Sequence, residues 1–268
     1  MEEQEFDPVR DAARRAVAAF LDLPDHAPLL RHWQTSLGLS RHDIEAGYMG
    51  YSLDSLDCDN DMYASAATHV AMWIEYQDSR SMHARRQQVV LDELRRRQAR
   101  SIVDVGFGAP TQYVRDYVAR TPGVQALLLD KYPAAIDVGR SMMSFWSAQW
   151  EERVRFAVHD MDVDAPIGGC DAYLFLDSIE HTIDPMSYLR ATVSSARPDA
   201  LFLLHMPVGP SIKSHSIAWD SDKAALAWLA AAGLAVDRTE SILPNPAADH
   251  FARRGVRTTN LFVAGRKP

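Results

Sequence analysis

Acidic residues stand at or near the ends of three short apolar runs, each of which suits a buried strand. Asp104 lies in SIVDV, Asp130 ends GVQALLLD, and Asp160 ends RVRFAVHD. A carboxylate at the end of a second parallel strand can accept hydrogen bonds from both ribose hydroxyls of an adenosine. Asp160 is placed to accept from an adenine amino group, with Met161 against the ring. Capping would explain one such aspartate, whereas three at successive strand ends favour a nucleoside site.

A glycine-containing loop leaves the first of these runs, in the stretch SIVDVGFGAPTQYVRDY. Gly106 and Gly108 allow a tight turn and close approach of the backbone to a ligand. Pro110 stands where a third glycine would be expected. Since proline has a fixed φ and no N–H, we expect it in the first turn of the following helix. The missing amide weighs against a dinucleotide, whose pyrophosphate would need it.

Groups capable of proton transfer follow the next apolar strands. Glu180 and His181 come just after the run that ends at Asp177, and His205 lies near the end of the run ALFLLHMP. Carboxylates and imidazoles serve as general bases or substrate anchors, so we predict these three residues as catalytic. Capping of the next helix is the alternative for Glu180 and His181. A hydrogen-bonded neutral histidine is the alternative for His205.

An acidic stretch in the N-terminal part, AGYMGYSLDSLDCDNDMY, begins with Tyr48 and Tyr51. The spacing of Asp57, Asp59 and Asp61 matches only the start of a calcium loop, because the required glycine is missing. A solvated loop is one interpretation. The other is a lid that holds an amine-bearing substrate by charge, with the tyrosines against a cation. We predict Tyr48 and Tyr51 as substrate-binding.

Two regions of different pattern must position these groups. Residues 1–98 are predicted to be helices joined by polar loops. In HARRQQVVLDELRRRQ, Val90, Leu91 and Leu94 are expected to face inward and the arginines outward. From Ser101 onward, apolar strands alternate with helices, which indicates a parallel sheet covered on both faces. Two successive strands near the C-terminus add one antiparallel edge strand. The fold class is therefore α/β: residues 99–268 form a Rossmann-like, doubly wound, mostly parallel sheet, and residues 1–98 a helical lid.

Composition narrows the classes of partner. The chain has 268 residues, a formal net charge of −8 and two cysteines. Nucleic acid requires basic surface, so it is not an expected partner. Two distant cysteines make neither a disulfide framework nor a zinc site. No apolar run reaches membrane-spanning length, and the acidic start is unlike a signal peptide. We expect a cytoplasmic protein that acts on a small molecule.

The segment from about Ser101 to Lys267 resembles the class I S-adenosylmethionine-dependent methyltransferases. Their first motif, acidic-x-Gly-x-Gly-x-Gly, is similar to DVGFGAP, and their second and third motifs correspond to Asp130 and to Asp160-Met161. CDAYLFLDSIEHTIDP looks like the FDxVxxxxVLEHxxDP run of the small-molecule branch. The resemblance implies S-adenosylmethionine as cofactor, with these residues around it: Asp104, Gly106, Phe107, Gly108, Asp130, Lys131, Asp160, Met161 and Asp177.

The resemblance also raises a metal hypothesis. Asp177, Glu180 and His181, with either His205 or His215, could supply ligands, and some RNA methyltransferases use a similar Glu-x-x-Glu-His pattern. Here the first acid is Asp and the net charge disfavours RNA. We therefore expect no metal, and we assign His215 to substrate binding.

The implied function is methyl transfer to an amine, hydroxyl or carbon of a metabolite, in specialised biosynthesis. Two alternatives stay open. The same fold can use the sulfonium as a fixed charge in an elimination or ring closure, or the chain can be a non-enzymatic subunit of a partner enzyme. A homodimer is equally compatible with the sequence.

Overall fold

The structure is a computed structural model that describes residues 7–54, 60–210, 212–249, 252, 254–256 and 258–268. Two of the aspartates considered for calcium, Asp57 and Asp59, lie outside these residues. Within the described part, no helix is long and apolar enough to cross a membrane.

Seven strands in the described residues form one sheet, in the order β3-β2-β1-β4-β5-β7-β6. All neighbouring pairs from β3 to β5 are parallel, whereas β7 runs antiparallel to both β5 and β6. The predicted Rossmann-like, mostly parallel sheet with one antiparallel strand at its edge region is confirmed. The antiparallel strand is β7, and β6 beside it is the last strand of the sheet. The strand bounds are β1 Ser101–Val105, β2 Gln125–Asp130, β3 Val154–Val158, β4 Ala172–Leu176, β5 Leu201–Val208, β6 Ala235–Ile242 and β7 Thr259–Arg266.

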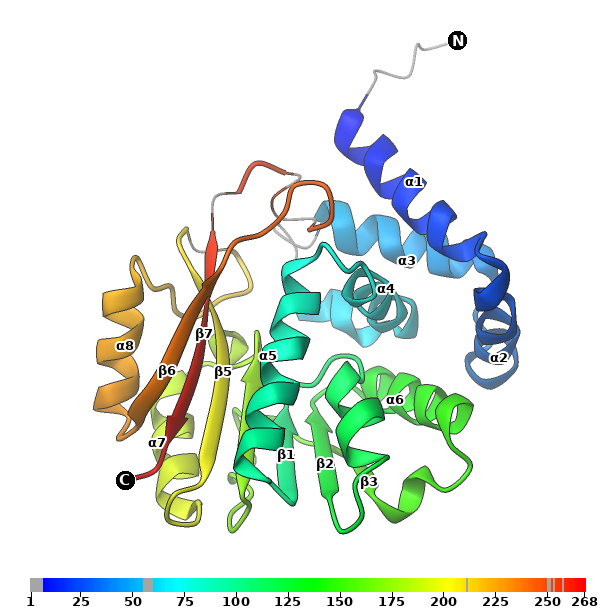
Figure 1. The fold of residues 1–268 in the computed structure, drawn as a ribbon. Helices are drawn as coiled ribbons and strands as arrows, with labels where there is room; N and C mark the ends of the chain where they lie inside the picture. The colour runs from blue at the N-terminus through cyan, green and yellow to red at the C-terminus, as the bar shows by residue number, and fades with distance from the viewer. Residues whose placement is uncertain (1–6, 55–59, 211, 250–251, 253, 257) are drawn as a thin grey trace.

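Helices cover both faces of the sheet (Figure 1). Because successive side chains of a strand point to opposite faces, Ile102 and Val103 of β1 belong to different cores. Ile102 packs with α5 (Met82–Arg97) and α6 (Pro133–Trp146). Val103 packs with α7 (Pro185–Ser195) and α8 (Asp222–Ala231). This two-sided burial explains why the strands read as continuous apolar runs.

The N-terminal helices form a layer beyond the carboxyl ends of the strands (Figure 1). They have their own core, centred on Trp33, whose indole N–H lies 3.0 Å from Sδ of Met142 on α6. This contact joins the layer to the sheet domain. The helices are α1 Pro8–Leu21, α2 Ala27–Leu37, α3 Arg41–Asp54 and α4 Ala66–Tyr76. The division of the chain at residue 98 stays a prediction, since α5 shares the core of the sheet.

Two details differ from the sequence analysis. The outward orientation predicted for the arginines of α5 is wrong for Arg86, which is only 1% exposed because it pairs with an acidic group at the end of β4. The position predicted for Pro110 is also wrong. The following helix begins at Gln112, where the side chain of Gln87 accepts the backbone N–H at 2.8 Å.

Candidate functional site

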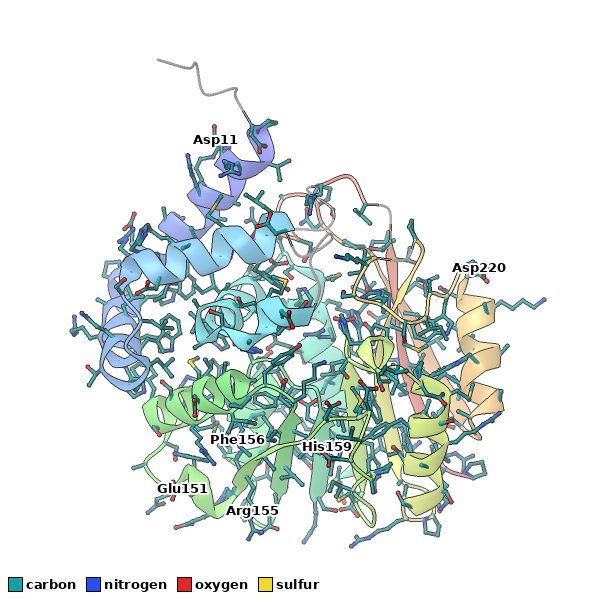
Figure 2. The ribbon with its side chains drawn as sticks, turned by 180° about the vertical axis from the view of Figure 1, so that it is seen from behind. Asp11, Glu151, Arg155, Phe156, His159 and Asp220 are labelled. Atoms are coloured by element: carbon teal, nitrogen blue, oxygen red, sulfur yellow. The ribbon has the colours of Figure 1, made fainter. Side chains whose placement is uncertain are left out.

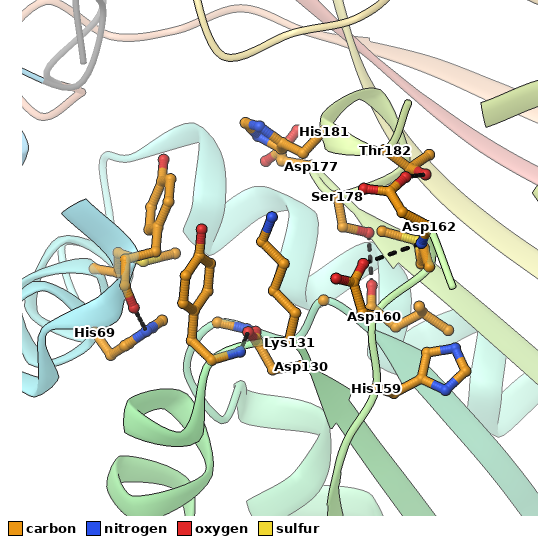
Figure 3. A pocket seen from close by; sticks show the side chains of 17 residues that line it. His69, Asp130, Lys131, His159, Asp160, Asp162, Asp177, Ser178, His181 and Thr182 are labelled. Carbon is orange, nitrogen blue, oxygen red and sulfur yellow. Dashed lines mark hydrogen bonds between the residues drawn. The ribbon is translucent and has the colours of Figure 1, made fainter. Parts of the chain in front are cut away.

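An open cavity of about 680 Å³ lies at the carboxyl ends of β1, β2 and β4 and at the loop after β3. Asp130 and Asp160 lie toward one end of it, and Asp177 and His181 toward the other (Figure 3). This is where ligands bind in doubly wound sheets. The cavity therefore brings together most of the residues predicted to hold a cofactor: Gly106, Gly108, Asp130, Lys131, Asp160, Met161 and Asp177.

The glycine loop after β1 forms one wall of this first cavity. Gly106 has φ +70°, and a Cβ on it would lie 2.5 Å from Cβ of Ser178. Gly108 has φ +58°, and its Cβ would lie 2.7 Å from Cε of Met72 on α4. Both the left-handed backbone and the close packing therefore require glycine. The loop is tight because the side chain of Ser178 packs against Gly106 and the side chain of Met72 packs against Gly108.

Asp130 is held at the wall by two backbone groups. Gly108 N–H donates to its Oδ2 and Tyr132 N–H donates to its Oδ1, both at 3.0 Å. Each carboxylate oxygen has a second lone pair, which leaves both able to accept a ligand hydroxyl. Burial raises the pKa of Asp130, against the opposing influence of His69. Asp160 is fixed in a similar way, since its Oδ1 accepts from Asp162 N–H at 3.0 Å.

Two of the predicted cofactor residues are not among those that line the cavities. The hydroxyl of Tyr113 donates to Oδ2 of Asp104 at 2.8 Å, inside the protein core. Phe107 packs against Phe156, with ring centroids 5.5 Å apart. Figure 2 shows Phe156 on β3, at the side of the sheet that α6 covers. These two residues support the loop from behind.

A second cavity, of about 740 Å³, adjoins the first. The two share Tyr63, Met72, Gly106, Asp177 and His181. Aromatic rings of the N-terminal layer form part of its wall, among them the predicted Tyr51. The side chains in it that can carry or accept a proton include His83, Glu180, His181 and His215. Tyr48 instead lies in the core of the helical layer.

Asp177 stands where the two cavities meet. Its backbone is left-handed, with φ +58°, a conformation that is uncommon outside glycine and often found at functional sites. His205 Nδ1–H donates to its Oδ1 at 2.6 Å, and the guanidinium of Arg86 donates to its Oδ2. Although burial alone would raise the pKa of Asp177, His205 and Arg86 hold it well below its usual range. An ionised carboxylate, paired with the guanidinium of Arg86, therefore sits at the junction.

His205, one of the predicted catalytic residues, lies behind Asp177 and is not among the residues that line either cavity. It is fully buried, and its Nε2 has no hydrogen-bond partner in the described residues. Its position makes it a support for the Asp177 carboxylate.

Glu180, His181 and His215 face one another in the second cavity. Glu180 is 0% exposed. Burial, and then the charge of Asp177, raise its pKa well above the usual value. Burial lowers the pKa of His181 to about 4 and that of His215 to about 3. Both imidazoles are therefore neutral at pH 7 and have a lone pair to offer.

The sequence analysis missed several residues of the site, above all His83 and Arg86 on α5. A signal was present, because residues 83, 86, 90 and 94 share one face of a helix, and Val90 and Leu94 are buried there. A charged side chain at this spacing faces the protein core, where it requires a partner of opposite charge. Others that were missed include Tyr63, His69, Met72, Tyr76, Tyr132 and Ser178.

Comparison with known proteins agrees with this architecture. No family model and no curated sequence matches the chain. Among solved structures, the mitomycin 7-O-methyltransferase MmcR superposes with a TM-score of 0.56 at 18% identity, over 96% of this chain and 72% of that one. The cyclase SpnF superposes with a TM-score of 0.54 at 15% identity, over 84% of this chain and 96% of that one. The N-methyltransferase NodS of Bradyrhizobium japonicum WM9, in complex with S-adenosylhomocysteine, superposes with a TM-score of 0.53 at 13% identity, over 71% of this chain and 90% of that one.

The chain thus has the fold of the class I S-adenosylmethionine-dependent methyltransferases. Two of the neighbours named here are methyltransferases by name, and the third is named a cyclase. Because identities at this level speak for the fold alone, the reaction has to be argued from the site.

Proposed function

We propose that this protein transfers a methyl group from S-adenosylmethionine to an amine, hydroxyl or carbon of a small metabolite. The observation that carries the proposal is the meeting of two cavities at Asp177, one lined by acidic strand ends and the other by aromatic rings and histidines. A transferase needs a donor site and an acceptor site that open into each other.

The residues of the first cavity fit the cofactor. We propose that the carboxylate of Asp130 accepts the two ribose hydroxyls and that Asp160 accepts from the adenine amino group. Asp177 supplies a negative charge for the cationic end of the molecule, where the ammonium and the sulfonium lie. Pro110 lacks an amide that the pyrophosphate of a dinucleotide would need, whereas S-adenosylmethionine has no phosphate and needs this amide less. When bound, the cofactor supplies an activated methyl group on a sulfonium.

The second cavity would hold the acceptor. Aromatic rings and histidines line it, and its wall reaches the first cavity at Asp177 and His181. Much of the rate of an in-line displacement can come from holding the nucleophile at attack distance. Glu180 and His181 remain the residues we propose to touch the acceptor, with His215 and Tyr51 beside them.

A second candidate reaction uses the same two cavities. If the cofactor stays intact and serves as a fixed positive charge, the chain would catalyse an elimination or a ring closure. The two proposals differ in one product, because only methyl transfer releases S-adenosylhomocysteine. We place either reaction in the cytoplasm as part of the same proposal, and a homodimer or a partner enzyme stays a prediction.

The test is calorimetric titration of the protein with S-adenosylmethionine and S-adenosylhomocysteine. We expect micromolar binding in the wild type, and at least tenfold weaker binding in Asp130→Ala. Asp137→Ala is the matched control, since Asp137 is an exposed acid on α6. Acceptors are then screened for release of S-adenosylhomocysteine. Absence of binding to either ligand would contradict the proposal, and product without S-adenosylhomocysteine would favour the second reaction.

A further inference from the structure

We propose that Glu180, His181 and His215 bind one divalent transition-metal ion at the wall of the second cavity. One ligand atom from each of the three side chains lies within 4.8 Å of the others. Two imidazoles and one carboxylate are the donor set of catalytic zinc sites and of non-haem iron sites that keep open positions. The sequence analysis expected no metal here, so the argument rests on how the three residues are held.

Glu180 provides the first reason. Its side chain is fully buried, and neither carboxylate oxygen has a hydrogen-bond partner in the described residues. A buried carboxyl group without partners costs free energy, whether it is neutral or charged. A cation beside it would satisfy both oxygens. The lone pairs of Glu180 are therefore available in a way that those of a capping carboxylate are not.

His181 provides the second reason. Its Nδ1 lies 3.1 Å from the carbonyl oxygen of Ser214, which can only accept. The ring must therefore carry its proton on Nδ1 and its lone pair on Nε2. A histidine that ligates a metal almost always donates its other N–H to a carbonyl or carboxylate in this way. The Ser214 carbonyl sets both the tautomer and the ring orientation.

The loop after β5 brings His215 to this pair. Ser216 N–H donates to the carbonyl of Glu180 at 2.8 Å, and its hydroxyl, which has one hydrogen to donate, lies within hydrogen-bond distance of the carbonyls of both Thr182 and Glu180. The rings of His181 and His215 lie edge to face, with centroids 4.8 Å apart. The loop is thus fastened to the segment that carries the other two ligands. These hydrogen bonds make a built site out of residues that lie 34 positions apart.

Other residues considered for a metal have their oxygens engaged. Asp177 receives His205 and Arg86, so it is not part of the set. A second buried group, Glu75, His83 and Asp249, also has three ligand types close together. There, Asp249 accepts from the hydroxyl of Ser81 and from Met82 N–H, which caps the start of α5. The Glu180 site is the one with an unpartnered carboxylate.

The site would also select the acceptor, and this step rests on the proposed function. Three protein ligands leave positions open on a transition-metal ion, and the three side chains line the second cavity. An acceptor that carries an oxygen donor, such as a hydroxyl or carboxylate, would bind the ion directly. Acceptors without a donor atom for the ion would then be poor substrates.

The experiment measures metal binding without turnover. The protein is stripped with a chelator, desalted and titrated with Co²⁺, read by its visible absorption, and with Zn²⁺ in competition with a chromophoric chelator. We expect one equivalent of Zn²⁺ in the wild type, and at least 100-fold weaker binding in both Glu180→Gln and His215→Ala. His83→Ala is the matched control, because it removes a buried histidine of the same cavity and should bind within threefold of wild type. Melting temperatures confirm that each variant is folded.

Three outcomes would overturn the inference: no stoichiometric binding by the wild type, unchanged binding in Glu180→Gln and His215→Ala, or loss of binding in His83→Ala. Calorimetry of the stripped protein with S-adenosylhomocysteine separates this inference from the proposed function. Cofactor binding without metal binding would overturn the metal site and leave the proposed function standing. Metal binding without cofactor binding would contradict the proposed function and leave the metal site standing.

Discussion

His205 and Asp177 are joined twice across neighbouring strands. The imidazole Nδ1–H donates to Oδ1 of Asp177 at 2.6 Å, and Asp177 N–H donates to the carbonyl of His205 at 3.0 Å. The first contact orients a side chain and the second fixes the left-handed backbone from which it projects. Together they hold one carboxylate at the junction of the two cavities.

His205→Leu is expected to weaken S-adenosylmethionine binding about tenfold, because the carboxylate loses a donor that fixes it. A hydrogen bond to a charged group contributes about 1.5–3 kcal/mol. His205→Asn places an amide N–H near the position of Nδ1 and should restore binding to within about threefold. Calorimetry measures both. Equal affinities for the two variants would show that the ring contributes only packing.

Arg86→Leu is expected to lower the free energy of unfolding by about 3 kcal/mol, because it leaves the partly buried charge of Asp177 with one partner fewer. Arg85→Leu is the control on the same helix. Arg85 is 49% exposed and pairs with Glu240 at 2.6 Å, and exposed pairs contribute about 1 kcal/mol or less. Urea unfolding gives both values. Similar losses in the two variants would mean that burial of the Arg86 pair has no special effect.

Gly106→Ala is expected to destabilise the fold by more than Gly169→Ala, and to abolish cofactor binding. Both glycines have left-handed backbones, with φ of +70° and +75°. A Cβ at Gly169 meets nothing within 4 Å, whereas one at Gly106 would lie 2.5 Å from Cβ of Ser178. Gly169→Ala therefore measures the backbone cost alone, about 1–2 kcal/mol. If the two losses match, the clash with Ser178 is relieved by movement of the loop.

Local patterns predicted the features that depend on local geometry. The strand ends at Asp130 and Asp160 and the glycine turn were identifiable because a strand, a turn and a helix follow one another in the chain. The layer of N-terminal helices over the sheet was also expected. The strand ends and the glycine turn depend on residues close together in sequence, whereas the contact that joins the helical layer to α6, between Trp33 and Met142, spans 109 residues.

The rest depended on long-range contacts. Arg86 was assigned to the surface because it is charged, although its spacing from Val90 placed it on the buried face. Its partner, Asp177, lies 91 residues away. His215 was named without a reason to meet His181, because their contact depends on a loop path fixed by Ser216 and Glu180. Sequence spacing gives no information about such a path.

The stability of the protein should carry a pH dependence that comes from Asp104. Burial raises the pKa of this carboxyl from its usual 3.8 to about 7, against the opposing hydrogen bond from Tyr113. Between these two values the folded chain keeps a proton that the unfolded chain has lost. Each pH unit in this window therefore favours unfolding by about 1.4 kcal/mol. The stabilisation is complete below about pH 4 and is lost as the pH rises toward 7.

Asp104→Asn removes this proton while its amide oxygen can still accept from Tyr113. The wild type minus variant difference in unfolding free energy should fall by a few kcal/mol between about pH 4 and pH 7, and then level off. Urea unfolding of both proteins at four pH values between about 4.5 and 7.5 measures this difference, which is expected to change by about 1.4 kcal/mol per pH unit. The contributions of the other titrating groups cancel, because both proteins contain them. Tyr113→Phe removes the donor that favours the charged form, so it should extend the slope above pH 7. A difference that stays flat, or one that rises with pH, would show that Asp104 is ionised in the folded protein.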